Sequence, residues 1–252
     1  MSNVVVITGG SGGIGAATAA RLRARGLSVA LVARDVARLE RVAAETGALS
    51  YPADVLDPES FGAAVERIEA EAGEIVGLVH AVGSIVLRPL HALSLAEFRA
   101  TLEINATSAF VALKGVVPKM MRRKRGSVVL FSTVAVQTGL QNHEAIAAAK
   151  GAIEGLVRSA AITYARYGIR VNAVAPALTK TELSKSLWSS DAMLAASVAM
   201  HPLGRVGEAG DIAAAAAFLA SDDASWVTGQ IWGVDGGLSA GVQPPKVSAP
   251  AR

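Results

Sequence analysis

The stretch at residues 4–15 most constrains how this chain folds. Residues 4–7 are all β-branched, residues 8–15 have the sequence TGGSGGIG, and the segment after them is rich in alanine. This order predicts a strand buried on both faces, a tight glycine turn and a helix. The first amides of a helix lack intrahelical partners and carry partial positive charge, so bare backbone there favours a pyrophosphate. We therefore interpret residues 4–15 as a dinucleotide-binding segment.

Length and composition limit the classes of protein to which the chain can belong. With 252 residues, 52% of them hydrophobic and 18% charged, it is long enough for one α/β domain with a large core. A formal net charge of +3 and the lack of a nucleic-acid-binding motif predict no nucleic-acid partner. Cysteine is absent and the four histidines lack metal-binding spacing, so we expect no metal site.

Secretion and membrane insertion are disfavoured by the same sequence. Every apolar run is interrupted by glycine, proline or a charged residue before it reaches the length of a membrane span. The N-terminus lacks the charged lead and apolar core of a signal peptide. We therefore expect a cytoplasmic protein with no membrane partner.

Apolar runs alternate with helical patterns along the whole chain. This alternation predicts a single Rossmann-type, doubly wound α/β domain over residues 1–240, with a mostly parallel sheet of about seven strands flanked by helices. Residues 241–252 are predicted to form a flexible C-terminal tail. The predicted strands are 4–7, 28–33, 75–79, 126–133 and 169–174, with a third strand and its exit at 49–55 and a last strand and a turn at 227–237. The longest predicted helix, 94–121, begins with a Ser94–Glu97 capping box and is expected to break at Pro118.

The end of the second predicted strand bears on the choice of cofactor. In a doubly wound sheet this tip lies beside the adenine ribose. Arg34 at this position would pair with a 2′-phosphate, whereas a carboxylate would accept from the 2′-hydroxyl of NAD. Asp35 follows directly, and it either turns toward the ribose or caps the helix at 36–46. Arg34 makes NADP the favoured cofactor and NAD the alternative.

Several motifs occur together and in one order along the chain. Residues 8–15 have the spacing Thr-Gly-x-x-x-Gly-x-Gly, residues 146–150 end in the lysine of a Tyr-x-x-x-Lys motif, and residues 176–181 match a Pro-Gly-x-x-x-Thr loop with alanine for glycine. With residues 202–207 and 227–237, these motifs resemble the short-chain dehydrogenase/reductase family from residue 4 to residue 237. The resemblance implies an oxidoreductase acting on a small-molecule substrate, and a homotetramer or homodimer.

The resemblance also implies a set of residues that contact the cofactor. These are Thr8, Gly9, Ser11, Gly13, Ile14, Gly15, Arg34, Asp54, Val55, Gly83, Lys150, Pro176 and Thr181. Asp54 is expected near the adenine amino group, with an exposed loop aspartate as the alternative. Thr181 is expected at the carboxamide or the phosphates, with a helix cap as the alternative. His80 stands where the family carries an asparagine, so it either replaces that amide as a hydrogen-bonding brace or the neighbourhood is rearranged.

The predicted helix around residues 143–152 lacks the residue with which the family performs its chemistry. By the spacing to Lys150, Ile146 occupies the position of the family's tyrosine, and Thr133, preceded by Ser132, occupies that of its serine. An isoleucine cannot donate a proton, and a positioned general acid contributes typically about 10²–10⁴-fold to a rate. Lys150 lies alone on an apolar face and needs a polar partner, for which the nicotinamide ribose is the candidate.

Several hypotheses about this site stay open. His143 lies one turn before Ile146 on the face that carries Lys150, which makes His143 a candidate proton donor, with Thr133 and Ser132 binding the substrate oxygen. Alternatively, the hydride acceptor is an activated C=C bond that takes its proton from water. A third hypothesis is that the chain binds a nucleotide as a regulatory protein and catalyses no reaction. A fourth is that it is a non-redox isomerase or lyase on the same fold.

Two further elements complete the predicted site. The resemblance implies that Asn105 binds a water of the proton relay and bends its helix. The alternative is that Asn105 is a polar residue that faces solvent. Residues 182–200 are amphipathic and stand where the family has a lid over the substrate. The lid residues predicted to line the site are Leu183, Leu187, Trp188, Met193 and Leu194. We therefore predict an NADP-dependent oxidoreductase that reduces a carbonyl or an activated C=C bond of a small, apolar substrate.

Overall fold

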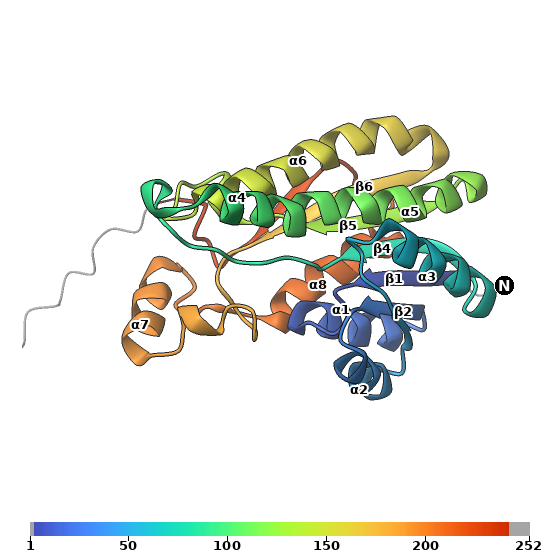
Figure 1. The fold of residues 1–252 in the computed structure, drawn as a ribbon, viewed down its shortest axis with the longest axis horizontal. Coiled ribbons are helices and arrows are strands. Elements are labelled where there is room, and N and C mark those ends of the chain that lie inside the picture. The colour runs from blue at the N-terminus through green and yellow to red at the C-terminus, as the bar shows by residue number, and fades with distance from the viewer. Residues whose placement is uncertain (1–2, 242–252) are drawn as a thin grey trace, which may run out of the picture.

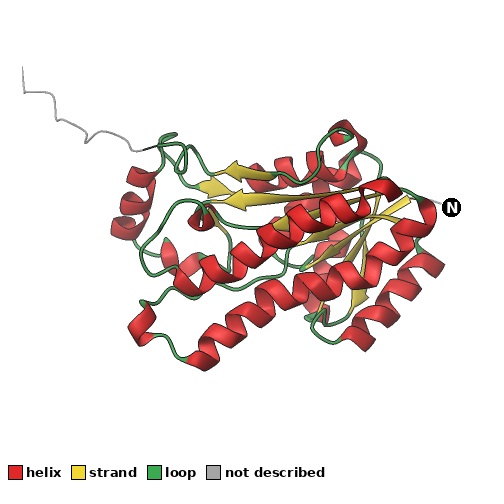
Figure 2. Cartoon of the chain, turned by 90° about the horizontal axis from the view of Figure 1, so that it is seen from above, coloured by secondary structure: helices red, strands yellow, loops and turns green. Residues whose placement is uncertain are grey.

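A seven-stranded, all-parallel sheet forms the centre of the molecule, with helices on both faces (Figures 1 and 2). The structure is a computed structural model that describes residues 3–241. The strand order is β3-β2-β1-β4-β5-β6-β9, and β7 pairs with β8 in a separate ribbon. The strands are β1 Asn3–Thr8, β2 Ser28–Ala33, β3 Leu49–Pro52, β4 Glu74–His80, β5 Gly126–Phe131, β6 Ile169–Pro176, β7 Thr179–Lys180, β8 Gly207–Glu208 and β9 Ile231–Val234.

The helices divide between the two faces of the sheet, which confirms the predicted doubly wound fold. Helices α3, α5 and α6 pack on one face and α1, α2 and α8 on the other. Strand order reverses between β1 and β4, so a crevice opens at their carboxyl ends. The helices are α1 Gly13–Ala24, α2 Val36–Thr46, α3 Pro58–Glu71, α4 Leu95–Leu102, α5 Ser108–Arg123, α6 Glu144–Tyr164, α7 Asp191–Met200 and α8 Ala209–Ala220.

The continuous apolar run of β1 is explained by burial on both faces. Val4 and Val6 belong to the apolar cluster beneath α3, α5 and α6, whereas Val5 and Ile7 belong to the cluster beneath α1, α2 and α8. All four side chains are almost completely buried, because successive residues of a strand point to opposite faces of the sheet. The helices on both faces therefore fix the position of β1 and of the turn that follows it.

The break of the long helix predicted at Pro118 is wrong, and the helix is irregular where the bend at Asn105 is expected. The Ser94–Glu97 capping box is present, but Pro118 lies inside α5, which continues to Arg123. The helix is interrupted instead by a π-helical turn at Glu103–Thr107, between α4 and α5. The Asn105 side-chain amide donates to the Thr101 carbonyl, so it takes up backbone hydrogen-bonding capacity where the turn widens.

The fifth predicted strand is longer than the one in the structure, because residues 132–133 leave the sheet and β5 ends at Phe131. Within 49–55, β3 ends at Pro52 and residues 53–55 form its exit, and within 227–237, β9 begins at Ile231. The fold thus turns out of the sheet just before Ser132 and Thr133. The predicted tail lies outside the described residues except for Gly241, and the domain boundary at residue 240 stays a prediction. Within residues 3–241, no helix has the length and apolar character needed to cross a membrane.

His80, the last residue of β4, is a hydrogen-bonding brace. Its Nδ1 lies 2.7 Å from Thr8 Oγ1 and its Nε2 lies 3.0 Å from Ser108 Oγ. Because the Ser108 hydroxyl donates to the Ile104 carbonyl, it accepts from Nε2–H, and Thr8 donates to Nδ1. Burial, together with the charge of Lys150, lowers the pKa of His80 to about 3. The neutral ring therefore joins β1, β4 and α5, which decides between the two alternatives for this position.

Replacing the brace should destabilise the protein. His80→Ala removes both hydrogen bonds and leaves a cavity, so we expect the free energy of unfolding to fall by about 2–4 kcal/mol in urea denaturation. The exposed His91→Ala is the control, with an expected change within about 0.5 kcal/mol. In the wild type, the free energy of unfolding should fall as pH falls from 6.5 toward 3. Over this range the His80 ring binds a proton in the unfolded chain but stays neutral in the folded protein. Equal stability of the two variants would contradict the brace.

Candidate active site

The turn between β1 and α1 brings bare backbone to the carboxyl edge of the sheet. Gly9 has a φ of +72°, and a Cβ at this position would lie 2.6 Å from the Ala81 carbonyl oxygen. A Cβ at Gly15 would lie 2.5 Å from the Gly9 carbonyl oxygen. Helix α1 begins at Gly13 with no side-chain cap and no acidic residue in its first turn. Its first amides are therefore available to a pyrophosphate, and the turn fits the cofactor that the sequence predicts.

Most of the predicted cofactor residues line one groove beside this turn. The groove has a volume of about 850 Å³. The predicted residues that line it are Thr8, Gly9, Ser11, Gly13, Ile14, Gly15, Arg34, Asp54, Val55, Gly83 and Thr181. Lys150 and Pro176 line a second cavity instead. Because Ile14, Gly83 and Thr181 border both hollows, groove and cavity adjoin at the end of β1 and β4.

The end of the groove beside β2 carries charged groups of both signs. The Arg34 side chain is 74% exposed and pairs with Asp54 at 3.6 Å. Asp35 borders the groove, but its Oδ1 accepts a hydrogen bond from the Arg38 amide and caps α2. Arg38 also lines the groove and was missed in the sequence. Its place in the first turn of α2, three residues after the capping Asp35, was the available signal.

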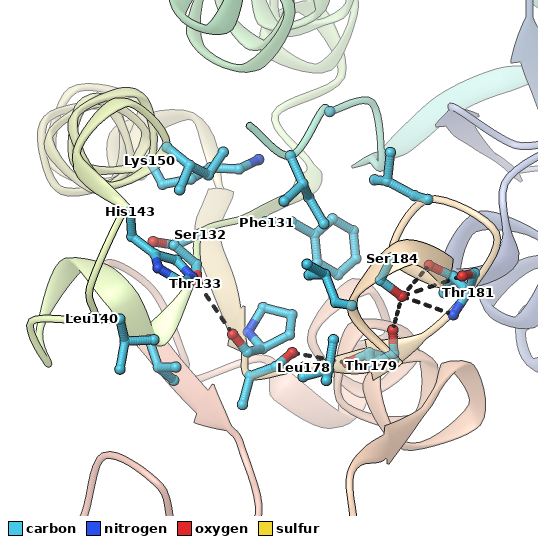
Figure 3. A pocket seen from close by; sticks show the side chains of 18 of the residues that line it. Phe131, Ser132, Thr133, Leu140, His143, Lys150, Leu178, Thr179, Thr181 and Ser184 are labelled. Atoms are coloured by element: carbon cyan, nitrogen blue, oxygen red, sulfur yellow. Dashed lines mark hydrogen bonds between the residues drawn. The ribbon is translucent and has the colours of Figure 1, made fainter. Parts of the chain in front are cut away.

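The second cavity has a volume of about 340 Å³ and holds every predicted catalytic residue (Figure 3). Asn105, Ser132, Thr133, His143 and Lys150 all border it. Most of the remaining lining side chains are apolar, among them the ring of Phe131 between Lys150 and the Thr181–Ser184 turn. Polar groups of the wall come from the residues after β5, from α6 and the residue before it, from the π-helical turn and from residues 179–201.

Lys150 is a buried cation that lacks a protein partner. Lys150 is 8% exposed, and its ammonium group makes no hydrogen bond or ion pair within residues 3–241. Burial lowers the pKa of Lys150 to about 8. The ammonium lies beside Gly83, where a Cβ would approach Nζ to 3.5 Å. An unsatisfied donor at the junction of groove and cavity fits the ribose hydroxyls that the sequence predicts for it.

Asn105 faces the interior, so the solvent-facing alternative is wrong. It is fully buried in the π-helical turn, and its side-chain amide donates to Thr101 O at 3.0 Å and to Ser84 Oγ at 3.1 Å. Its Oδ1 accepts from the Ser84 amide. The expected bend of the helix is confirmed as this turn, and the role of Asn105 in a water relay stays a prediction.

Ser132 and Thr133 point to different surroundings. The Ser132 hydroxyl donates to Oε1 of the buried Glu154 at 2.9 Å. Thr133 Oγ1 lies 3.4 Å from the Pro176 carbonyl oxygen, at the wall of the cavity (Figure 3). Ser132 is thus engaged with α6, whereas Thr133 Oγ1 also accepts a hydrogen bond from the Ala135 amide. Glu154 was missed in the sequence, although its place one turn after Lys150 was a signal that could have been used.

Ile146 and His143 lie at the cavity as their spacing predicts. Ile146 is 5% exposed and borders the cavity from α6. His143 occupies the position before the first residue of α6, and its Nδ1 lies 2.7 Å from the Gln141 carbonyl oxygen. Because a carbonyl oxygen only accepts, Nδ1 carries a proton and Nε2 is the atom left for a substrate.

The predicted lid borders the cavity with only part of its apolar face. Leu183 and Leu187 line the cavity, but the prediction is wrong for Trp188, Met193 and Leu194, which lie outside its wall. The Trp188 indole instead donates to Ser184 Oγ. Residues of the wall that the sequence did not indicate include Ser184, Ser197, Met200 and His201.

Thr181 links this lid segment to the glycine turn. The Thr181 amide donates to Ser184 Oγ, and its methyl group lies 3.1 Å from where a Cβ of Gly13 would be. Its side chain therefore stands over the start of α1.

Comparison with known proteins decides the family. A sequence profile described as "Enoyl-(Acyl carrier protein) reductase" matches residues 9–239. Cis-4-hydroxycyclohexanecarboxylate dehydrogenase of Sinomonas cyclohexanicum is 40% identical over 94% of this chain and 96% of that protein. 2-(S)-hydroxypropyl-CoM dehydrogenase 3 of Xanthobacter autotrophicus is 38% identical over 95% and 97%. The chain belongs to the short-chain dehydrogenase/reductase family.

Solved structures of the short-chain dehydrogenase/reductase family match the whole fold. Levodione reductase superposes with a TM-score of 0.90 at 36% identity, over 95% of this chain and 98% of that one. ElxO with NADP bound gives a TM-score of 0.89 at 27% identity, over 96% and 100%. The chain is therefore an oxidoreductase of this family, whose members bind NAD or NADP. A second Xanthobacter relative, 38% identical over 85% of this chain and 96% of that protein, is named "Inactive 2-(S)-hydroxypropyl-CoM dehydrogenase 2", so membership alone does not establish turnover.

A side chain at the glycine turn should abolish cofactor binding in this family member. Gly15→Ala places a Cβ against the Gly9 carbonyl oxygen and displaces the first amides of α1. We expect titration of reduced cofactor, followed by nicotinamide fluorescence, to give an affinity at least about tenfold weaker. Gly62→Ala in α3 is the matched control, because a Cβ there meets no atom within 4 Å. Unchanged affinity in folded Gly15→Ala protein would show that the phosphates lie elsewhere.

Proposed function

We propose that the protein is an NADP-dependent oxidoreductase that reduces a carbonyl or an activated C=C bond of a small, apolar substrate without a catalytic tyrosine. The observation that carries the proposal is the unpartnered Lys150 ammonium at the junction between the glycine groove and the apolar cavity. Groove, cation and cavity together supply a cofactor site, a ribose anchor and a dry substrate site. Bound NADPH would supply the hydride, and the chain must supply orientation and a proton.

The preference for NADP is supported by charge at the adenosine end. Arg34 and Arg38 both border the groove, and guanidinium groups bind phosphate with charge-assisted hydrogen bonds. The one carboxylate that directly follows β2, that of Asp35, is occupied in capping α2. Asp54 is the remaining acid, and its pairing with Arg34 reduces its availability to a ribose hydroxyl.

Loss of Arg34 should weaken the binding of NADPH and leave the binding of NADH nearly unchanged. Arg34→Ala removes a charge-assisted contact to the 2′-phosphate, so we expect the Kd for NADPH to rise about tenfold to a hundredfold. The Kd for NADH, measured by the same fluorescence titration, should change much less. Arg41→Ala on α2 serves as control, because Arg41 pairs only with Glu45 and lies outside the groove. Equal weakening of both cofactors would contradict a 2′-phosphate site at Arg34.

In this proposal His143 donates the proton that the carbonyl oxygen takes up during reduction. Reduction of a carbonyl places negative charge on its oxygen, which the Thr133 hydroxyl can bind and the Lys150 cation can stabilise electrostatically. Ile146 has no proton to give. The Gln141 carbonyl fixes the tautomer of His143, so Nε2 gives a proton in the imidazolium form and takes one from an alcohol in the neutral form.

Removal of His143 should affect turnover far more than binding. We expect His143→Ala to lower kcat for ketone reduction by about 10²–10⁴-fold, with the Kd for NADPH nearly unchanged. Ile146→Tyr in the same background tests the position of the missing phenol, and should restore part of the turnover because Lys150 lies one turn away. His91→Ala is the exposed control. If His143→Ala retains the kcat of the wild type, another donor supplies the proton, as water would for an activated C=C bond.

A direct experiment separates this function from its alternatives. NADPH and NADH are titrated by fluorescence, and the loss of reduced cofactor is then followed with a panel of ketones and enones. The proposal expects NADPH to bind more tightly than NADH and at least one panel member to be reduced. Binding of NADPH with no reduction of either class would favour the non-catalytic regulatory protein, to which Ile146 and the relative named inactive lend weight. A non-redox isomerase or lyase would convert its substrate without consuming NADPH.

We also propose a homotetramer or homodimer in the cytoplasm. Apolar side chains point outward from two neighbouring helices, with Phe110 on α5 54% exposed and Ile162 on α6 82% exposed. Trp226, before β9, is 99% exposed. Such surfaces favour burial against a second copy. Light scattering in solution tests this assembly, and the mass of a monomer at micromolar concentration would contradict it.

A further inference from the structure

The turn that leads into α6 contains an uncommon backbone conformation. Within residues 3–241, Asn142 and Lys124 are the two residues other than glycine that have a positive φ. Lys124 ends α5, where a left-handed residue is common because it lets the last helical carbonyls accept hydrogen bonds. Asn142 ends no helix, and its φ of +64° directly precedes His143. Left-handed backbone away from a helix end costs free energy and clusters at functional sites.

Residues 140–143 form a β-turn beside the cavity. The His143 amide donates to the Leu140 carbonyl at 3.3 Å, and both of these residues border the cavity (Figure 3). A positive φ at the third residue, Asn142, with none at Gln141, is the pattern of a type II turn. Type II differs from the commoner type I by a flip of the central peptide, here the one between Gln141 and Asn142. The conformation of Asn142 therefore determines where the Gln141 carbonyl oxygen points.

That carbonyl oxygen is the hydrogen-bond acceptor of the His143 ring. It lies 2.7 Å from Nδ1, so Nδ1 carries a proton. His143 is half-buried, and among residues 3–241 its Nε2 has no partner and is not one of the buried unpaired atoms. Nε2 is thus accessible. In a type I turn the Gln141 carbonyl would point away from the ring, and Nδ1 would lose its acceptor.

A second contact holds the turn against the loop that follows β4. The Asn142 carbonyl accepts a hydrogen bond from the Arg88 amide at 3.0 Å. The Arg88 side chain pairs with Glu97, in the capping box of α4, at 3.1 Å. At its other end the same loop is bonded to Asn105 through Ser84. The turn before α6 and the π-helical turn are therefore joined through one loop.

We propose that Asn142 is a positioning residue, which holds the turn at residues 140–143 in its flipped form and so fixes the Nδ1–H tautomer of His143 at the cavity wall. The inference rests on the proposed function, in which His143 donates the proton through Nε2. Asn142 itself borders neither groove nor cavity. Asparagine tolerates the left-handed region better than other side chains do, whereas a β-branched residue is strongly disfavoured there.

The test compares two substitutions at Asn142 with a matched one elsewhere. Asn142→Gly permits the left-handed conformation, and Asn142→Val disfavours it. Lys124→Val introduces the same strain at the end of α5, on a residue that lines neither groove nor cavity. Thermal melts establish that each variant is folded. NMR of protein with isotope-labelled histidine nitrogens reads the tautomer of the neutral His143 ring, with His143→Ala identifying its signals.

We expect the Nδ1–H tautomer of His143 in the wild type and in Asn142→Gly, and its loss in Asn142→Val. For ketone reduction with NADPH, Asn142→Val should lower kcat about 5–30-fold, which is the population penalty of a left-handed side chain. KM and the Kd for NADPH should stay nearly unchanged. Lys124→Val should keep the kcat of the wild type. In the His143→Ala background, Asn142→Val should change kcat by less than about twofold, because its target is gone.

An unchanged tautomer and kcat in folded Asn142→Val would overturn the inference, because the fold would then hold the turn without Asn142. An equal loss of kcat in the His143→Ala background would also overturn it, because Asn142 would then act on another group. Failure of the proposed function has a different signature, which is binding of NADPH by the wild type without reduction of any ketone. That result would remove the catalytic role of the turn, whereas the NMR spectra decide separately whether Asn142 sets the tautomer.

Discussion

The close approach of the β1–α1 turn to the end of β4 is the constraint on which the site depends. Gly9 and Gly15 are packed so tightly against carbonyl oxygens that neither position has room for a Cβ. This contact leaves α1 beginning without a side-chain cap, and so leaves its first amides free for an anion. His80 holds the same two strands together from the other side through Thr8 and Ser108. Groove and brace are therefore parts of one junction.

The electrostatics of the cavity are dominated by the charge of Lys150, which this junction does not neutralise. Lys150 is buried beside Gly83 without a counter-charge, and its pKa is lowered to about 8 by that burial. In a wall of mostly apolar side chains, the cation is stabilised only when hydroxyl groups reach it. Ile146 adds an apolar side chain to this wall, and His143, directly before α6, is a titratable side chain of the wall besides Lys150. Although this family member lacks the tyrosine, it thus keeps the residues proposed to bind the cofactor and to orient the substrate.

The sequence predicted the features that depend on local pattern. Residues 4–15, the alternation of strands and helices and the Ser94–Glu97 capping box each follow from neighbouring residues, and the structure confirms them. The break predicted at Pro118 is absent, and the bend expected at Asn105 is a π-helical turn in which the Asn105 side-chain amide donates to the Thr101 carbonyl. Glu154, Arg38 and His201 were missed because their roles depend on which distant segments they meet.

The most direct test of the account is whether hydride leaves the cofactor inside this tyrosine-free cavity. The protein would be incubated with NADPH deuterated at C4 of the nicotinamide, each stereoisomer in turn, and with ketones and enones at high protein concentration. Mass spectrometry would then locate the label in the product. The account predicts deuterium at the former carbonyl carbon, or at the β-carbon of an enone, from one stereoisomer only. Saturation with NADPH and no deuterium in any product would contradict it.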